Sequence, residues 1–425
     1  MPDDQDSLEI AAMALLQYTP ELARIDSCSL VLDVSASLSL FKGPRALYRR
    51  IRKTLSTIGI PVRISMAPTA TGAWLLAWQT QTKPRRILSM RSLERRLDTL
   101  PVNILPVLQP YLHWLDALGC TTLKHLVQLP RTGLVQRTSP QVGQYLDAAY
   151  GKIVMPLTWY QAPDAFHAFC DLEFHTTHTH ALLAAAQRLL EQLCGWLQAR
   201  QWSASSMQFL LHYEKGRHAR PPACITLCLS APAWQVKDFT ALLTEQLQHE
   251  RLDAPAIAIE LHNVQGQPRC SQSGGLFPDP AHYQRQENQL VDLLRARLGQ
   301  KSILQPQPIA SYLPEHANQW VAADPSARRA GKKAKSKQDR PDSHHPFWLL
   351  ARPIELTTTN DRPMYKGRAL QLIHGPERIE SGWWMGGQHE QRDYFVACDS
   401  LQCRYWLYRQ RGSDDPRWFL HGLYA

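Results

Sequence analysis

Hydrophobic residues follow two different spacings along the first hundred positions of the chain. Apolar side chains recur at helical spacing over residues 8–16, which predicts a helix that ends before Pro20. The apolar run LVL at residues 30–32 lies among serines and predicts a short buried strand. Residues 41–55 predict a basic helix, and residues 59–77 predict a strand, a turn and another helix.

Residues 105–151 have the pattern of a helical hairpin. The segment LHWLDALGCTTLKHLVQLPR predicts two short helices joined by a tight turn at Gly119, with the second helix beginning at Thr121 or one residue later. Glycine allows a phosphate to approach the backbone, and the N–H groups that open a helix point at such an anion. Lys124 and Arg131 would add positive charge. The hairpin is a candidate DNA-backbone contact, and a purely structural hairpin is the alternative.

Strands and helices are predicted in the order βαββαβ over residues 166–264. The predicted strands cover residues 166–176, 207–214, 223–230 and 257–264, and the helices cover residues 181–200 and 234–250. Polar and apolar residues alternate along the second strand, so one face of the sheet is expected to be wet. Three cations in the loop after this strand are further candidates for DNA-backbone contact: Lys215, Arg217 and Arg220.

A loop between the last of these strands and the next helix contains Gln272, Leu276 and Phe277. Peptides that bind a sliding clamp place a glutamine and a Leu-Phe pair in adjoining pockets, and here the spacing is one residue longer. The intervening double glycine makes an extended bound form entropically costly. These three residues are a weak clamp-binding candidate. The alternative is that Leu276 and Phe277 fold back onto their own domain.

The last hundred residues change in character twice. Residues 321–346 include the run RRAGKKAKSKQDR, which has no large apolar side chain and predicts a disordered basic linker. Residues 347–425 are rich in aromatic residues and turn signals, and they predict a small antiparallel sheet. Such rings serve as interface hot spots or as the core of a small domain. The candidate partner-binding residues are Trp383, Trp384, Tyr405, Trp406, Trp418 and Phe419.

Composition narrows the classes of function. A chain of 425 residues is expected to form two to four domains, and its formal net charge of +10 favours a polyanionic partner such as nucleic acid. Nine scattered cysteines indicate reduced thiols and a cytoplasmic protein. Neither a signal peptide nor a membrane span is predicted. The run H-x-x-H-x-H at residues 175–180 lacks a nearby fourth ligand, so neither a metal site nor a cofactor is predicted.

The strand–helix–strand–helix order of residues 24–77 resembles the palm of Y-family (translesion, DinB/UmuC-like) DNA polymerases. Aligned on residues 32–34, the catalytic Asp-Glu pair of that family falls on Cys28 and Ser29. Two-metal phosphoryl transfer needs paired carboxylates, and a thiol and a hydroxyl do not hold Mg²⁺. Trp74 stands where the family has a phosphate-facing lysine. A strand-end or turn role is expected for the nearby Asp33.

Three segments resemble the ImuB family more specifically, the catalytically inactive Y-family polymerase-like proteins of bacterial mutagenesis cassettes. They are the Arg-Ala-Arg-Leu-Gly helix at residues 295–299, RDYFVACDSLQCRYWLYR at residues 392–409 and WFLHGLYA at residues 418–425. The first palm strand and the fingers of a Y-family polymerase are expected to be missing before residue 22.

This resemblance implies an α+β multidomain fold with partial Y-family architecture. The expected parts are a palm remnant (residues 1–100), a helix–hairpin–helix thumb (101–155), a βαββαβ little finger with its C-terminal helix (164–320), the basic linker (321–346) and a β-rich C-terminal module (347–425).

The resemblance further implies a non-catalytic adaptor that works in translesion synthesis during the SOS response to DNA damage. Such an adaptor would bind primer–template DNA on the nucleoid. It would also recruit an error-prone C-family polymerase, a RecA-like ImuA protein and the sliding clamp. A divergent DNA polymerase and a protein scaffold without DNA binding are the two alternatives.

Overall fold

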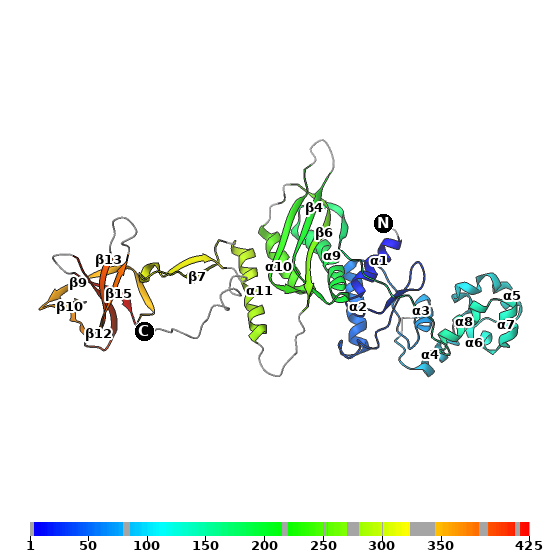
Figure 1. The fold of residues 1–425 in the computed structure, drawn as a ribbon. Helices are drawn as coiled ribbons and strands as arrows, with labels where there is room; N and C mark the ends of the chain where they lie inside the picture. Colours follow the sequence, from blue (N-terminus) through cyan, green and yellow to red (C-terminus); the bar gives the residue numbers. More distant parts are fainter. Residues whose placement is uncertain are drawn as a thin grey trace. The chain divides into compact units, whose positions relative to one another are not determined.

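A computed structural model describes the chain as two compact units, one ending at Arg297 and the other beginning at Leu298. The described residues are 4–79, 86–214, 220–249, 252, 254–269, 280–299, 301–323, 345–381, 390–412 and 417–424. The first unit mixes helices with strands, and the second is rich in β-structure (Figure 1). This confirms the mixed α and β character expected from the sequence. None of the helices in the described ranges is long and apolar enough to cross a membrane.

The N-terminal elements follow the sequence pattern in most places. They are α1 (Asp4–Leu15), β1 (Leu22–Arg24), β2 (Leu30–Leu32), α2 (Pro44–Ile58) and α3 (Ala70–Trp78). The prediction of a strand between residues 59 and 66 is wrong: within the described residues only a single bridge, between Met66 and Arg86, forms there. A strand needs a neighbour for its backbone N–H and C=O groups; β1 pairs with β2, and Ala23 of β1 also forms a bridge with Trp159. Gly59, with φ of 85°, ends α2.

A four-stranded antiparallel sheet forms the centre of the first unit. Its elements are β3 (Ala168–Thr176), α9 (Thr179–Ala199), β4 (Trp202–Tyr213), β5 (Ala223–Ala233), α10 (Val236–His249) and β6 (Ala256–Pro268), followed by α11 (Pro280–Leu298). The predicted βαββαβ order is confirmed, and the strands lie in the order β3-β6-β4-β5. Helices α9 and α10 cover one face (Figure 1), where Met207, Phe209 and Leu211 of β4 are buried.

The two N-terminal helices share the core of this sheet. Leu47, Ile51 and Leu55 of α2 join the same buried cluster as the inward residues of α9 and β4. Helix α1 crosses α9 at Gly195, where a Cβ atom would lie 1.8 Å from the carbonyl oxygen of Met13. A glycine is required here because any side chain would occupy the space of the α1 backbone.

A second core is formed by the helices that lie between α2 and β3 in the sequence. They are α3, α4 (Met90–Leu97), η1 (Val102–Ile104), η2 (Pro106–Tyr111), α5 (Leu112–Ala117), α6 (Leu123–Gln128), α7 (Arg131–Arg137) and α8 (Pro140–Ala149). Trp74 of α3 and Leu93 of α4 are buried with Leu115 and Leu123 of the hairpin. The cores therefore divide residues 1–100 between two bodies, whereas the sequence analysis assigned that range to one domain.

The second unit combines a short hairpin with a seven-stranded antiparallel sheet. The hairpin consists of β7 (Leu304–Pro308), η3 (Pro314–His316) and β8 (Asn318–Ala322). The sheet contains β9 (Trp348–Thr359), β10 (Arg362–Tyr365), β11 (Arg368–Ala369), β12 (Gln371–Ser381), β13 (Glu390–Cys398), β14 (Arg404–Gln410) and β15 (Trp418–Leu423). The order is β11-β10-β9-β15-β14-β13-β12, which confirms the antiparallel sheet predicted over residues 347–425.

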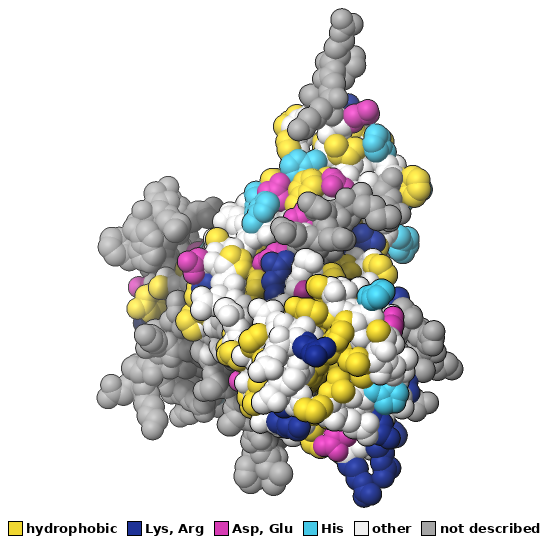
Figure 2. Space-filling view, turned by 90° about the vertical axis from the view of Figure 1, so that its right-hand side faces the viewer, with side chains coloured by type: hydrophobic (Ala, Val, Ile, Leu, Met, Phe, Trp, Pro, Cys, Tyr) yellow, Lys and Arg dark blue, Asp and Glu magenta, His cyan; other side chains and the backbone are white. Residues whose placement is uncertain are grey.

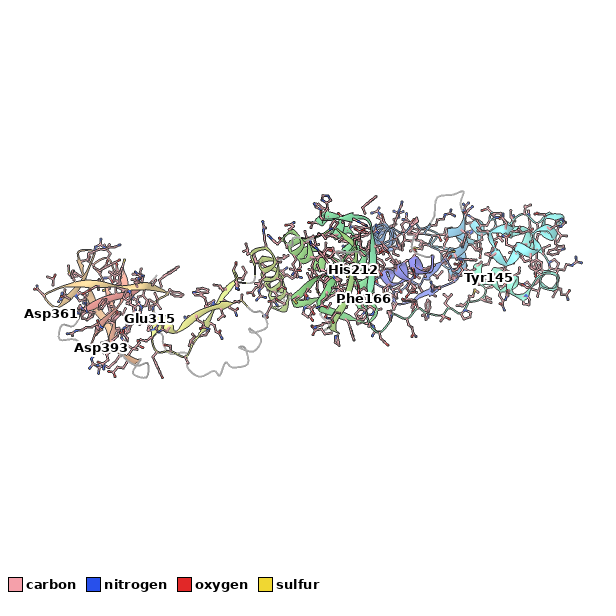
Figure 3. All side chains as sticks on the ribbon, turned by 90° about the horizontal axis from the view of Figure 1, so that it is seen from above. Tyr145, Phe166, His212, Glu315, Asp361 and Asp393 are labelled. Atoms are coloured by element: carbon pink, nitrogen blue, oxygen red, sulfur yellow. The ribbon has the colours of Figure 1, made fainter. Side chains whose placement is uncertain are left out.

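A buried polar network ties η3 to the seven-stranded sheet. The Arg392 guanidinium donates to Glu315 Oε1 at 2.9 Å and to the Tyr394 hydroxyl at 3.1 Å, and that hydroxyl lies 2.8 Å from His421 Nδ1. Glu315 and Asp393 of this unit are labelled in Figure 3. Burial raises the pKa of Tyr394, and burial lowers the pKa of His421 although the charge of Glu315 opposes it. Each buried polar group here has a partner, as a satisfied network requires.

The crossing of α1 and α9 can be tested with Gly195→Ala. The added methyl group overlaps the Met13 carbonyl, so α1 must move, and we expect the free energy of unfolding to fall by about 3 kcal/mol. Equilibrium denaturation measures this. The matched control is Gly133→Ala, a helical glycine with open space around the new Cβ atom, which should not destabilise the protein. Equal unfolding free energies for the two variants would contradict the close contact.

Candidate nucleic-acid interface

The loop between β1 and β2 holds a carboxylate that is already satisfied by neutral donors. Asp26 Oδ1 accepts a hydrogen bond from the Cys28 backbone N–H at 2.8 Å, and Asp26 Oδ2 accepts one from the Trp74 indole N–H at 2.9 Å. The same indole nitrogen lies 3.3 Å from Ser29 Oγ. The Trp74 indole therefore bridges Asp26 and Ser29, in the loop that the sequence analysis aligned with the catalytic strand of a polymerase palm.

The protonation of Asp26 follows from these contacts. Its partial burial favours the neutral acid and would raise its pKa, but the hydrogen bonds from Cys28, Trp74 and Ser29 outweigh burial and lower the pKa. Asp26 thus stays ionised without a cation beside it. The donors are an amide, an indole and a hydroxyl, none of which is displaced without leaving an unpaired polar group.

Among the described residues, the hydrogen-bond partners of Asp26 are neutral and include no second carboxylate. Asp33 is exposed, its Oδ1 accepts the Ser35 backbone N–H at 2.9 Å, and it serves the turn after β2, as the sequence analysis expected. Cys28 is exposed and supplies a thiol rather than an oxygen ligand. Across the described ranges of the chain, no group of three or more His, Cys, Asp or Glu side chains is arranged to hold a metal ion. The residues around Asp26 do not fit a pair of Mg²⁺ ions.

The two short helices and the turn at Gly119 predicted within residues 112–131 are present in the structure. Helices α5 and α6 flank Gly119, whose φ is 70° and around which a Cβ atom would meet nothing within 4 Å. The Cys120 N–H donates to the Leu115 carbonyl at 2.9 Å, and the Leu123 N–H donates to the Leu100 carbonyl at 2.9 Å. The base of the hairpin is therefore anchored in the second core, while its tip is exposed.

Exposed groups at this tip suit a phosphate backbone. Thr121 and Lys124 are exposed, as is the backbone around Gly119, and Leu118 presents 51% of its surface. In the view of Figure 2, which looks onto the end that carries α5 to α8, hydrophobic side chains reach the surface between separate Lys and Arg side chains. A hydroxyl, an ammonium and an accessible glycine backbone are ordinary phosphate contacts.

Arg131 has an internal role that the sequence did not reveal. Its guanidinium forms an ion pair with Asp147 and donates to the Gly143 carbonyl, which ties α7 to α8. Its charge is thus largely matched within the protein, and Lys124 is the stronger candidate for phosphate contact.

The open face of the four-stranded sheet carries a cluster that sequence reasoning missed. Glu260 of β6 is bonded to His212 Nε2 at 2.7 Å and to His167 Nε2 at 2.9 Å, and His262 Nδ1 lies 3.3 Å from it. Figure 3 marks His212 on this sheet. Alternation along β4 correctly predicted that His212 faces away from the core. Nothing in the sequence could pair it with Glu260, because strand order decides that contact.

Burial would raise the pKa of Glu260. The hydrogen bonds and charges of His167 and His212 outweigh burial, so the pKa is lowered. The centre of the open face is therefore an ionised carboxylate among imidazoles.

Two curated proteins match the whole chain. They are the Protein ImuB sequences of Caulobacter vibrioides strains NA1000 / CB15N and ATCC 19089 / CIP 103742 / CB 15, each 26% identical over 450 residues. The match covers 99% of this chain and 94% of each relative. The predicted resemblance to ImuB is confirmed. No protein-family model matches the chain.

Solved structures similar to this ImuB-like chain are Y-family polymerases. The insertion ternary complex of Dbh DNA polymerase is 14% identical, with a TM-score of 0.32, over 61% of this chain and 76% of that chain. DinB from Sulfolobus solfataricus is 13% identical, with a TM-score of 0.32, over 63% of this chain and 77% of that chain.

Several predicted site residues of the ImuB-like chain lie outside the described residues. These are Lys215, Arg217, Gln272, Leu276, Phe277, Trp383 and Trp384. Arg220 is exposed beside β5. Among the predicted partner-binding rings, Trp406 is 1% exposed and Trp418 is 8% exposed, while Tyr405 and Phe419 are half-buried. Trp406 stacks on Tyr394 with ring centroids 4.1 Å apart, so the core alternative describes Trp406 and Trp418.

The hydrogen bond from Trp74 to Asp26 is testable by Trp74→Phe. Removing the indole N–H takes away a contact that favours the charged carboxylate, so the pKa of Asp26 should rise toward its ordinary value. Carboxyl-carbon NMR titration measures it. Trp78→Phe, in the same helix but 42% exposed, is the control and should leave the titration unchanged. An unchanged pKa in Trp74→Phe would refute the bridge.

The Glu260 cluster makes a pH-dependent prediction. Its folded pKa lies below the unfolded value, so its stabilisation is present above the unfolded pKa and disappears as pH falls through the folded pKa. Glu260→Gln should cost about 1 kcal/mol at about pH 7, and the difference should shrink toward about pH 3. Thermal unfolding across pH measures it. Glu355→Gln, on an exposed ion pair, is the control. A difference that grows with acid would contradict the assignment.

Proposed function

We propose that this chain is a non-catalytic, ImuB-like adaptor in damage-induced mutagenesis and translesion synthesis. It binds primer–template DNA through the first unit and brings an error-prone C-family polymerase and an ImuA-like partner to the lesion through the second. The likeness to ImuB over 99% of the chain supports a role in damage-induced mutagenesis.

One observation carries the non-catalytic part of the proposal. The loop between β1 and β2, in the segment that resembles the polymerase palm, carries Cys28 and Ser29, and the neighbouring Asp26 is held by Trp74 and a backbone amide. Phosphoryl transfer by two metal ions requires oxygen ligands that converge on both ions. A lone carboxylate occupied by neutral donors supplies too few such ligands.

DNA contact is supported by the exposed hairpin. Its tip combines an open glycine backbone with Thr121 and Lys124, and its base is fixed by hydrogen bonds into the second core. Because the base is fixed, the exposed groups at the tip are held in position to contact phosphates. The formal net charge of +10 adds a general attraction for DNA.

Partner contact is assigned to the second unit. Trp406 and Trp418 are buried, so other apolar residues must supply the contact. Phe347 and Trp348, at the start of β9, are 90% and 68% exposed. Exposed aromatic rings of this size are typical of interface anchors. The clamp-binding candidates Gln272, Leu276 and Phe277 and the rings Trp383 and Trp384 remain sequence-based predictions.

DNA binding is tested by the affinity for a primer–template junction over a series of salt concentrations. Lys124→Ala should lower the affinity several-fold and reduce the slope of log K against log salt by about 0.9, the value for one phosphate contact. Lys237→Ala is the control, because Lys237 is an exposed lysine on α10 and not part of the hairpin. Arg131 is left unchanged because it holds α7 on α8. Equal slopes for both variants would remove the hairpin from the DNA interface.

The same preparations address catalysis. Neither Mg²⁺ nor Mn²⁺ should support template-directed primer extension. Extension by the wild type that is abolished in Asp26→Asn would establish a divergent polymerase and overturn the non-catalytic assignment.

A further inference from the structure

Helix α2 displays a row of arginines on the side opposite its buried face. Arg45, Arg49 and Arg52 are exposed and follow one another at spacings of four and three residues, which places them on one face of the helix. We call these three residues the α2 arginine row. Leu47 and Ile51 are buried in the core of the first unit. Core packing therefore fixes the rotation of α2 and the direction in which the row faces.

Within the described ranges of the chain, the row forms no ion pair with an acidic residue. The sequence of α2, PRALYRRIRKTLSTI, contains no Asp or Glu, and no ion pair of the described residues involves the row. Some arginines of the chain are matched internally, as Arg131 is by Asp147 and Arg392 by Glu315. Like charges three or four residues apart destabilise a helix. An unmatched row on a packed helix therefore calls for an anion from outside the chain.

Neighbouring cations and aromatic rings extend this charged surface. Lys53 is exposed on the adjacent side of α2, and Arg86 lies 5.0 Å over the ring of Tyr48 in the same helix. Arg50 lies 5.5 Å over the ring of Phe41. Stacking on a ring limits the motion of a guanidinium while its N–H groups stay available to an oxygen acceptor.

We propose that the α2 arginine row is a second contact for the DNA phosphate backbone, separate from the helical hairpin. With a rise of about 1.5 Å per residue, the row spans about 10 Å, the length of about three phosphates along one strand. Guanidinium groups bind phosphate oxygens in bidentate fashion. The inference rests on the proposed function, because DNA held at the hairpin brings further phosphates to the same unit.

DNA is favoured over an acidic protein segment for one reason. The row contains no apolar pocket between its arginines: Ala46 and Tyr48 are half-buried, and the large apolar residues of α2 face inward. A peptide partner would need such a pocket as an anchor, whereas a phosphate backbone requires only evenly spaced charge.

The test uses the full chain and two triple variants that each remove three positive charges from the formal net charge of +10. One is Arg45→Gln/Arg49→Gln/Arg52→Gln in the row. The matched control is Arg352→Gln/Arg362→Gln/Lys366→Gln, at exposed positions of the second unit. Binding to a primer–template junction, to its duplex portion and to its single strand is followed by fluorescence anisotropy over a salt series.

The row variant should bind the junction about 10- to 100-fold more weakly, and its salt slope should fall by about 2 to 3. The control should change the slope by less than one contact. The portion of DNA whose binding is lost identifies whether the row takes duplex or single strand. Since the neutralised helix loses its internal repulsion, the thermal midpoint of the row variant should not fall.

Two results would overturn the proposal. Indistinguishable salt slopes for the row variant and the control would mean that the row makes no phosphate contact. Loss of binding to a polyglutamate peptide in the row variant, with DNA binding unchanged, would identify an acidic protein as the partner. A wild-type chain that binds no DNA at all would instead refute the proposed function. If Lys124→Ala weakens DNA binding and the row variant does not, the proposed function stands and only the contact by the row is refuted.

Discussion

The close crossing of α1 over α9 at Gly195 is the contact on which the first unit depends. A backbone-to-backbone approach of this kind allows no side chain between the helices, so the position of α1 is set by the sheet that α9 covers. Helix α2 packs into the same core through its apolar face. The N-terminal helices α1 and α2 therefore share one core with α9. They extend the core of the four-stranded sheet, and the orientation of every exposed residue on α2 follows from that packing.

Trp74 connects the second core to the loop between β1 and β2. In this chain the large indole fills part of the second core, tilted against Tyr145 with ring centroids 6.2 Å apart, and its N–H still points at Asp26. A lysine at this position would bring a mobile charge toward a phosphate. The tryptophan instead donates its indole N–H to the carboxylate of Asp26 and so holds the loop between β1 and β2 against α3. The interaction stabilises the fold at a place where a polymerase requires open ligands.

Charge is distributed unevenly over the molecule. Buried or half-buried arginines such as Arg392 are matched by carboxylates, because an unpaired charge inside a protein is strongly unfavourable. The open sheet face balances Glu260 with histidines. Exposed cations on the hairpin and on α2, such as Lys124 and Arg49, form no ion pair among the described residues, and such groups remain available to a polyanion.

The sequence alone determined the local elements of this protein. Periodicity identified α1, the βαββαβ order and the antiparallel C-terminal sheet, and Gly119 with its neighbours identified the hairpin, because spacing and turn chemistry act within a few residues. The alignment of Cys28 and Ser29 with the catalytic pair of Y-family polymerases rests on the sequence alone and stays a prediction.

Only the tertiary structure decided which distant residues meet. It placed Trp74 on Asp26, assigned Arg131 to Asp147, gathered three histidines around Glu260 and buried Trp406 in the core. Composition could not distinguish an interface tryptophan from a core tryptophan, or a free arginine from a paired one. Those differences arise from strand order and helix packing, which bring together residues that lie dozens of positions apart in the chain.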